Sequence, residues 1–547
     1  MSKLEQAQSL CEAMRAVVGS ATVALATRCE VDGRIDVTRI DEHQTVAYDL
    51  ASIASALTAA EHLVAWGSKG ELEADLALAL AADVAVDLQS RVAGRESSWG
   101  LDAGVLHDQH DALVAGRDPG FLAGIATRVL ATGEAGSRHL PEDLEMVRQT
   151  FRRFAEDRVA PVAEQVHRND EDIPEDVISG LAELGCFALS IPADYGGFAE
   201  GGEDELLNMV LVTEELSRGS LGVAGSLITR PEIMGTAILK GGTEEQKQGW
   251  LPTMASGEKM CAVAVTEPDV GSDVAGVKVT ATRDGGDWVI DGVKTWCTFA
   301  GRADLLLVLA RTDPDRSLGH KGLSLFVVEK PRFPGHAWRA EQDEGGGSMD
   351  ARAIPTLGYR GMHSFEISFD GWRVPHSALI GEDDGLGRGF YLQMQAFANA
   401  RLQTAARAQG VMQSALDRSV SYTKDRRVFG SPLADYELNR IKIARMAALL
   451  AGCRVFSTEV ARQLARGDQG GQLGASQLKQ LSCRVTEWVT REALQLHGGY
   501  GYAEEYTVSR LFVDARVLSI FEGTDEVLAL RVIARTMLTD ALARSPA

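Results

Sequence analysis

One acidic residue near the C-terminus has neighbours that suit proton abstraction from carbon. Glu522 stands between the apolar pair Ile520-Phe521 and the pair Gly523-Thr524, directly before a helical run. A carboxylate held at a helix entrance and partly removed from water holds a proton more tightly than an exposed one. Such a group can act as a general base toward a weakly acidic C–H bond. An ordinary acidic residue in a first helical turn fits the same pattern, so this segment alone leaves both interpretations open.

A second group of residues, in the middle of the chain, suits a flat polar ring. Segment 261–281 (CAVAVTEPDVGSDVAGVKVTA) offers the hydroxyls of Thr266 and Ser272 and several unhindered backbone amides, which suit a heterocycle or a diphosphate. In GVKTWCTFAG, Trp296 and Thr298 fall on one face of a strand by the two-residue period. An aromatic wall beside a hydroxyl suits a planar ring system. Alternatively, the first segment is a strand that ends in a turn, and Trp296 fills the core.

Other chemical patterns are weaker. Segment 494–506 (LQLHGGYGYAEEY) has close glycines but lacks the strand–GxGxxG–helix context of a dinucleotide fold. His107 and His110 have no carboxylate or histidine constellation beside them, so we expect no metal site. The seven cysteines are odd in number and contain no CxxC pair, so we expect reduced packing residues rather than disulfides.

Length, composition and charge limit the class of protein. With 547 residues, the chain is long enough for three to four domains at roughly 150 residues each. Hydrophobic content of 45% and charged content of 24% indicate a packed globular protein. A net charge of -22 repels nucleic acid and anionic lipid. The aliphatic stretches, such as Leu305–Ala310, fall far short of the ~18 residues of a membrane span, and no targeting leader is evident, so we expect a cytoplasmic protein.

The hydrophobic period changes along the chain and predicts the elements that position these residues. Helical spacing occurs in 49–65 and 71–92, and helices punctuated by prolines follow in 141–254. From 261 to 375 the pattern alternates, with Asp284-Gly285-Gly286 and Asp291-Gly292 as hairpin turn signals. Long helices return after Gly389. The order of helices, a β domain and then long helices is uncommon.

Five segments together resemble the acyl-CoA dehydrogenase family. TEPDVGSD, KTWCT, DRRVFG, LQLHGG and FEGTDE stand in the family's order, and the resemblance covers about 141–542. It implies a multidomain α+β fold with a helical domain, a central β-barrel and a C-terminal four-helix bundle. Here an extra N-terminal helical module precedes them. The expected domains are 1–135 for this module, 136–258, 259–376 and 377–547.

The resemblance implies FAD as cofactor and an acyl-CoA thioester as substrate. Glu522 is similar to the family's catalytic base, and Ala400 stands where some relatives carry that acid. Glu522 would remove the α-proton while the β-hydrogen leaves as hydride to flavin N5. The Glu522 backbone N–H and a ribityl hydroxyl would stabilise the enolate-like oxygen. The cofactor residues implied are Val263, Val265, Thr266, Ser272, Trp296, Thr298, Thr524 and Glu526, and, across a subunit boundary, Arg426, Val428, Phe429, Gln495, Gly498 and Gly499.

Segment 226–235 (SLITRPEIMG) contains residues that we expect to contact the acyl group. Arg230, in an otherwise apolar run, could clamp a second carboxylate of the substrate, which favours a short branched dicarboxylic acyl-CoA. Alternatively, Arg230 pairs with Glu232 or reaches water. Glutaryl-CoA or another short acyl-CoA is the nearest competing substrate. The candidate substrate residues are Ser272, Thr229, Arg230, Phe397, Arg401 and Gly523.

The N-terminal module leads to a prediction of the oligomeric state. Residues 39–67 resemble 432–463, so we interpret 39–132 as a decayed, non-catalytic copy of the C-terminal bundle that would cap the chain as a homodimer rather than a tetramer. Any two Ala/Leu-rich helical hairpins can look alike, which is the alternative. The resemblance implies electron transfer flavoprotein as electron acceptor. A flavin monooxygenase or oxidase on the same fold, or a non-catalytic flavoprotein scaffold, are rival classes that Glu522 and the net charge disfavour.

Overall fold

The computed structural model describes residues 1–343, 346–468 and 470–544. The chain forms two compact units. The first unit joins residues 1–145 to residues 404–547, and the second comprises residues 146–403. One long helix, α14 (Gly389–Asp425), begins in the second unit and ends in the first.

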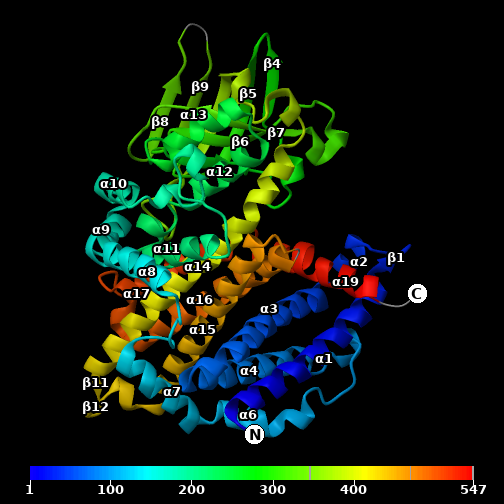
Figure 1. The fold of residues 1–547 in the computed structure, drawn as a ribbon, viewed down its shortest axis with the longest axis vertical. Helices are drawn as coiled ribbons and strands as arrows, with labels where there is room; N and C mark the ends of the chain where they lie inside the picture. The colour runs from blue at the N-terminus through cyan, green and yellow to red at the C-terminus, as the bar shows by residue number, and fades with distance from the viewer. Residues whose placement is uncertain (344–345, 469, 545–547) are drawn as a thin grey trace. The chain divides into compact units, whose positions relative to one another are not determined.

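The first unit contains the N-terminal module, built on three long helices, α1 (Lys3–Cys29), α3 (Gln44–Trp66) and α4 (Glu71–Val92). Ser2 and Glu5 form a capping box that starts α1. Alanine and leucine fill the buried faces of α3 and α4, so the three helices pack closely against one another (Figure 1). The remaining elements of this region are β1 (Glu30–Val31), β2 (Arg34–Ile35), α2 (Val37–Glu42), η1 (Gly67–Lys69), α5 (Glu96–Trp99), η2 (His107–Gln109), α6 (His110–Arg117) and α7 (Pro119–Thr132).

Helix α1 is, among the described residues, the one helix long and apolar enough to cross a membrane by length and composition. No uninterrupted aliphatic stretch marks this helix in the sequence, because polar residues, among them Glu12 and Arg15, interrupt its apolar ones. Its most apolar window has a mean hydropathy of 1.3, and 44% of that window is buried inside the protein. Helix α1 packs against α3, α4 and α19, so the helix serves as a core element of this unit.

The C-terminal part of the first unit is helical, as predicted. Helix α3 contacts both α15 (Glu437–Ala465) and α16 (Gly470–His497), so the N-terminal module and the C-terminal helices share a hydrophobic core. The elements that complete this part are β11 (Arg427–Val428), β12 (Ser431–Pro432), η11 (Leu433–Asp435), η12 (Gly498–Tyr502), α17 (Thr507–Leu518), α18 (Asp525–Val527), η13 (Leu528–Ala534) and α19 (Arg535–Arg544).

The second unit opens with short helices, which the proline spacing predicts. Pro174 is the N-cap of α10, where proline costs no helical hydrogen bond. Pro161 instead lies inside a run that is helical without a break from Glu142 to Asn169, directly after the π-helical turn η3. The elements are α8 (Glu142–Phe154, which begins in the first unit), η3 (Ala155–Val159), α9 (Ala160–Asn169), α10 (Glu175–Glu183), η4 (Cys186–Ala188), η5 (Ala193–Tyr195), α11 (Glu205–Gly219), η6 (Leu221–Gly225), α12 (Thr229–Gly241) and α13 (Glu244–Ala255).

A curled sheet of eight strands follows in the same unit. Its order is β3-β6-β4-β5-β10-β9-β8, and β7 pairs with β6. Strand β6 is buried along its whole length, because one face joins the inner core of the sheet and the other packs with residues of α12 and α13. The strands are β3 (Cys261–Ala264), β4 (Thr280–Asp284), β5 (Asp287–Thr298), β6 (Leu305–Arg311), β7 (Leu323–Glu329), β8 (Ala337–Glu341), β9 (Ser348–Ala353) and β10 (Ser364–Pro375), with η7 (Val274–Gly276), η8 (Arg316–Gly322), η9 (His376–Ala378) and η10 (Glu382–Gly385) between or after them.

One of the two hairpin predictions is wrong. The Asp284-Gly285-Gly286 turn connects β4 and β5, whose pairing closes at Asp284 and Asp287. Asp291-Gly292 instead lies inside β5, where the register with β10 shifts between Phe369 and Trp372. Gly292 has a φ of 127°, and an added Cβ would lie 2.9 Å from a methyl carbon of Val279. The glycine therefore serves a bulge that bends the sheet, not a turn.

Candidate active site

A buried ion pair in the second unit joins the two central motifs. Lys294, on β5, is fully buried, and its Nζ lies 2.9 Å from Glu267 Oε1 and donates to the carbonyl of Val265 at 2.9 Å. The Glu267 carboxylate also accepts the backbone N–H groups of Lys278 and Val279, each at 2.8 Å. Burial lowers the pKa of Lys294, and the charge of Glu267 opposes that change. The pair fixes the TEPDVGSD segment to the KTWCT strand.

The predicted flavin residues of these motifs come together beside this pair. The Thr295 N–H donates to the Thr266 carbonyl at 2.8 Å, which ties Thr266 to β5. Trp296 is 53% exposed, with a φ of 57°, so the core-filling alternative is wrong. Thr298 is half-buried, and its hydroxyl is 2.8 Å from that of Ser364. Its place on the same face as Trp296 stays a prediction, because the pairing of β5 with β10 shifts register here. An exposed indole beside a hydroxyl fits a flat ring system.

The other residues predicted around this ring differ in exposure. Val263 lies in β3 and is half-buried, and Val265 is buried against the apolar cluster of α12, α13 and β6. Ser272 is exposed in the Gly-containing turn that follows, and so is Gly271. The turn thus leaves hydroxyl and amide groups accessible, as a phosphate-bearing ligand requires.

Glu522 is the centre of a polar cluster in the first unit. Arg407, on α14, is fully buried, and its Nη2 lies 2.8 Å from both carboxylate oxygens of Glu522. The Thr404 hydroxyl donates to the same carboxylate. Only 11% of the Glu522 side chain is exposed. The carboxylate of Glu522 is therefore largely buried, as predicted. Its environment is polar rather than apolar, because the guanidinium of Arg407 faces it.

The backbone around Glu522 is constrained. Glu522 has a φ of 56° and Gly523 a φ of 100°, and Lys479 Nζ donates to the Gly523 carbonyl at 2.6 Å. The Thr524 hydroxyl accepts the Val527 N–H at 3.3 Å and caps α18. Glu522 thus lies just before a helix start, as the sequence predicts.

A cavity of about 310 Å³ borders this segment within the first unit. Thr524 and the exposed Glu526 line it, together with the cations Arg484 and Arg516. Arg484 lies 3.9 Å from Asp525 and Arg516 lies 3.2 Å from Glu487, so carboxylates of the same cavity already face both guanidinium groups. The cofactor contacts of Thr524 and Glu526 stay a prediction. Its lining is completed by Glu487, Ser519, Ile520 and Asp525.

The residues predicted to hold the adenosine diphosphate across a subunit boundary lie on two adjoining segments of the first unit. Arg426 follows the last residue of α14 and lies over the Tyr500 ring at 5.8 Å, while Tyr422 stacks on His497 at 4.1 Å. Phe429 is 99% exposed at the tip of the β11–β12 hairpin, beside the half-buried Val428. The other segment supplies Gln495, at the end of α16, and Gly498 and Gly499, at the start of η12. Their contact with a second subunit stays a prediction.

The candidate acyl residues of the second unit include a buried arginine. Arg230, on α12, is 7% exposed, and it donates to the Ser226 carbonyl at 2.8 Å and to the Tyr359 hydroxyl at 2.9 Å. Among the described residues no carboxylate forms an ion pair with Arg230, and Glu232 instead accepts from Gln403. Arg230 therefore neither pairs with Glu232 nor reaches water, and both of these predictions are wrong. The other candidates in this unit are the buried Thr229 and the half-buried Phe397 and Arg401 of α14.

One further cluster has atoms suited to a metal. Ligand atoms of Asp170, His336 and His363 lie within 4.8 Å of one another. Arg360 already lies 3.7 Å from Asp170, and His363 lies 3.1 Å from Asp172. A guanidinium beside the carboxylate disfavours a second cation, so ion pairing explains the cluster and we assign no metal there.

Comparison with known proteins agrees with this geometry. Three domain models match: acyl-CoA dehydrogenase N-terminal domain at residues 141–258, middle domain at 262–372 and C-terminal domain at 387–538. The chain belongs to the acyl-CoA dehydrogenase family. It is accordingly an FAD-dependent oxidoreductase that acts on CH–CH bonds of acyl-CoA substrates. Its exposed Trp296 and Ser272 and its half-buried Thr298 fit that cofactor.

Individual relatives add detail. A (2S)-methylsuccinyl-CoA dehydrogenase of Cereibacter sphaeroides is 39% identical over 96% of each chain. The mitochondrial short-chain specific acyl-CoA dehydrogenase of Bos taurus is 34% identical over 72% of this chain and 90% of its own. Among solved structures, butyryl-CoA dehydrogenase from Megasphaera elsdenii matches with a TM-score of 0.67 and 29% identity, over 74% of this chain and all of that one.

Proposed function

We propose that this acyl-CoA dehydrogenase oxidises (2S)-methylsuccinyl-CoA to mesaconyl-CoA, a step of the ethylmalonyl-CoA pathway. The observation that carries the proposal is Arg230, a buried guanidinium whose hydrogen bonds go to neutral acceptors. A buried cation without an anion is costly, and a substrate carboxylate would compensate it. The relative that matches the N-terminal module as well as the family domains carries this activity by name.

The chain's own residues supply the acid–base part of the reaction. Glu522 is the proposed general base for the α-proton, and Arg407 and Thr404 hold its carboxylate in one place. The backbone N–H of Glu522 is the proposed donor to the thioester oxygen, where negative charge develops. Bound FAD would supply the hydride acceptor for the β-hydrogen. Trp296 and Thr298 are the proposed wall and hydroxyl against its ring.

The first experiment separates the function classes. The purified chain should be yellow, and methylsuccinyl-CoA should bleach it under anaerobic conditions, whereas butyryl-CoA should not. Bleaching by glutaryl-CoA in preference to methylsuccinyl-CoA would assign the competing substrate instead. A monooxygenase or oxidase would consume oxygen without acyl-CoA dehydrogenation, and a colourless protein would indicate a scaffold.

The second experiment tests the two named residues. Glu522→Gln should stay yellow and lose bleaching by at least about 100-fold, the contribution expected of a general base. Arg230→Gln should lower kcat/KM for the dicarboxylic substrate by about 10- to 100-fold, with little effect on a monocarboxylic one. Arg311→Gln is the matched control, because Arg311 is a buried arginine of the same unit whose hydrogen bonds also go to neutral acceptors, the backbone carbonyls of Val277, Gly319 and Ala275. Equal losses on both substrate types in Arg230→Gln would reject the acyl assignment.

Electron acceptor and assembly complete the proposal. Electron transfer flavoprotein is the proposed acceptor, tested by its reduction in the presence of acyl-CoA and enzyme. A homodimer is the proposed assembly, because the N-terminal module covers faces of α15 and α16. Size exclusion with light scattering tests it, and a stable tetramer would contradict it.

A further inference from the structure

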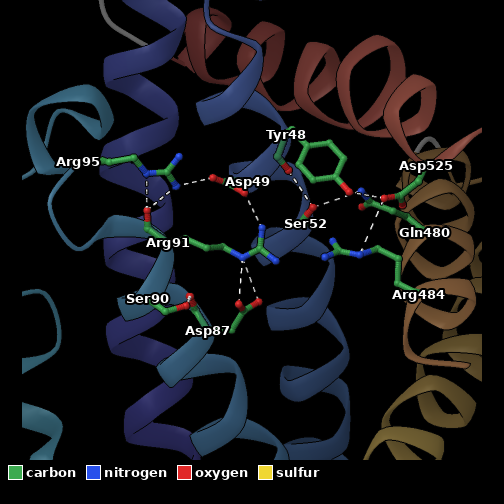
Figure 2. A network of polar contacts seen from close by, with 10 residues as sticks. All are labelled: Tyr48, Asp49, Ser52, Asp87, Ser90, Arg91, Arg95, Gln480, Arg484 and Asp525. Atoms are coloured by element: carbon green, nitrogen blue, oxygen red, sulfur yellow. Dashed lines mark hydrogen bonds and ion pairs between the residues drawn. The ribbon is translucent and has the colours of Figure 1, made fainter. Parts of the chain in front are cut away.

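Segment 522–526, which carries Glu522, contacts the N-terminal module through the side chains of Asp525 and Tyr48. The Tyr48 hydroxyl, on α3, donates to the carboxylate of Asp525, three positions after Glu522 (Figure 2). Asp525 is only 9% exposed. Arg484, on α16, lies 5.7 Å from the Tyr48 ring and 3.9 Å from the Asp525 carboxylate. Asp525 thus sits between a phenol from the module and a cation from the C-terminal helices.

A second contact fixes α3 against α16 at the same level. The Ser55 hydroxyl donates to Gln480 Oε1 at 3.0 Å, and Gln480 Nε2 donates to the Ser52 hydroxyl at 3.3 Å. All three side chains are buried. Lys479, the residue before Gln480, is the one that holds the Gly523 carbonyl. The module and the Glu522 segment are therefore connected through α16 as well as directly.

The segment needs such support because its backbone is strained. A non-glycine residue at positive φ, as at Glu522, costs about 1–3 kcal/mol and persists only where its surroundings determine it. Three helices contact this segment. Thr404 and Arg407 of α14 bind Glu522, Lys479 of α16 binds the Gly523 carbonyl, and Tyr48 of α3 binds Asp525. Only Tyr48 comes from outside the matched family domains, which begin at residue 141.

We propose that Tyr48 is a positioning residue for the general base, so that the N-terminal module completes the support of segment 522–526. The proposal rests on the proposed role of Glu522. The Tyr48 hydroxyl contacts Asp525 rather than Glu522, so Tyr48 acts on the base through Asp525. Loss of its hydroxyl removes a hydrogen bond to a buried carboxylate and lets the segment shift, which displaces the base.

The test compares Tyr48→Phe with Asp49→Asn in the full-length holoenzyme. Asp49 is the next residue on α3, and it pairs with Arg91 at 2.5 Å and with Arg95, both inside the module (Figure 2). Tyr48→Phe should lower kcat by about 10-fold, with a smaller change in KM, and should move the acid limb of the kcat–pH profile. Asp49→Asn should lower the melting temperature but keep both kcat and the pH profile.

The outcomes separate this inference from the function on which it rests. If Tyr48→Phe keeps the wild-type kcat and pH profile while Glu522→Gln is inactive, the positioning role is wrong and the base assignment stands. If Asp49→Asn lost kcat to the same extent, the effect of Tyr48→Phe would reflect the general stability of the module, and the inference would be wrong. Turnover that survives in Glu522→Gln would overturn both.

Discussion

One guanidinium nitrogen of Arg407 lies 2.8 Å from each carboxylate oxygen of Glu522. Arg407 is fully buried, so the pair lies largely outside water. Breaking such a pair from one side leaves an uncompensated charge, which is costly. The pair therefore makes the position of Glu522 and the stability of the first unit depend on one another.

Replacement of Arg407 should change the pH dependence of turnover. Without the cation, Glu522 takes up a proton at higher pH, and because a base must be ionised, the acid limb of the kcat profile should move to higher pH in Arg407→Gln. The free energy of unfolding should fall by about 3–5 kcal/mol. Arg407→Lys keeps the charge and should show a smaller shift. An unchanged pH profile in Arg407→Gln would show that the pair has no influence on the base.

Trp296 should contribute to flavin affinity. Because the indole is exposed, Trp296→Ala leaves the core intact and should weaken FAD binding by about 10-fold through lost stacking. Fluorescence titration of the apoprotein with FAD measures this. Leu357→Ala, which removes another exposed apolar side chain of the same unit, should leave FAD affinity unchanged. Equal affinities of Trp296→Ala and wild type would remove Trp296 from the cofactor site.

The Lys294–Glu267 pair should be required for both stability and flavin binding. Lys294→Met leaves a buried, unpaired Glu267 and should destabilise the protein by about 3–5 kcal/mol. Because Glu267 also anchors the backbone at Lys278 and Val279, flavin should be lost at a lower denaturant concentration than the far-UV signal. Simultaneous loss of flavin and secondary structure would argue for a purely structural pair.

The cysteines should be unreactive in the native protein. All seven are free and buried, and burial raises the pKa of Cys11, Cys297, Cys453 and Cys483 to about 12. Since the thiolate is the reactive form, a thiol reagent at pH 8 should label less than about one cysteine per folded chain. All seven should react in guanidinium chloride. Rapid labelling of the folded protein would indicate local opening.

The sequence predicts those structural features that depend on residues adjacent in the chain. The Asp284–Gly286 turn and the helix start after Glu522 have local signals, and the structure confirms both. Asp291-Gly292 has the same composition as a turn, yet the partner strand β10 decides that it is a bulge.

Long-range pairs carry no such local signal. The partner of Glu522 is Arg407, and the partner of Asp525 is Tyr48, in a distant part of the sequence. A lysine inside an apolar strand run, as at Lys294, is the one pattern that could have indicated a buried ion pair.

The shared core of α3 and α15 has a consequence for synthesis. Helix α3 leaves the ribosome first, but residues 67–436 must follow before α15 can cover its Ala/Leu face. At about 5–20 residues per second, this interval lasts roughly 20–70 s. During that time the Ala/Leu face of α3 stays uncovered, and apolar surface exposed in this way favours aggregation until the last fifth of the chain has emerged.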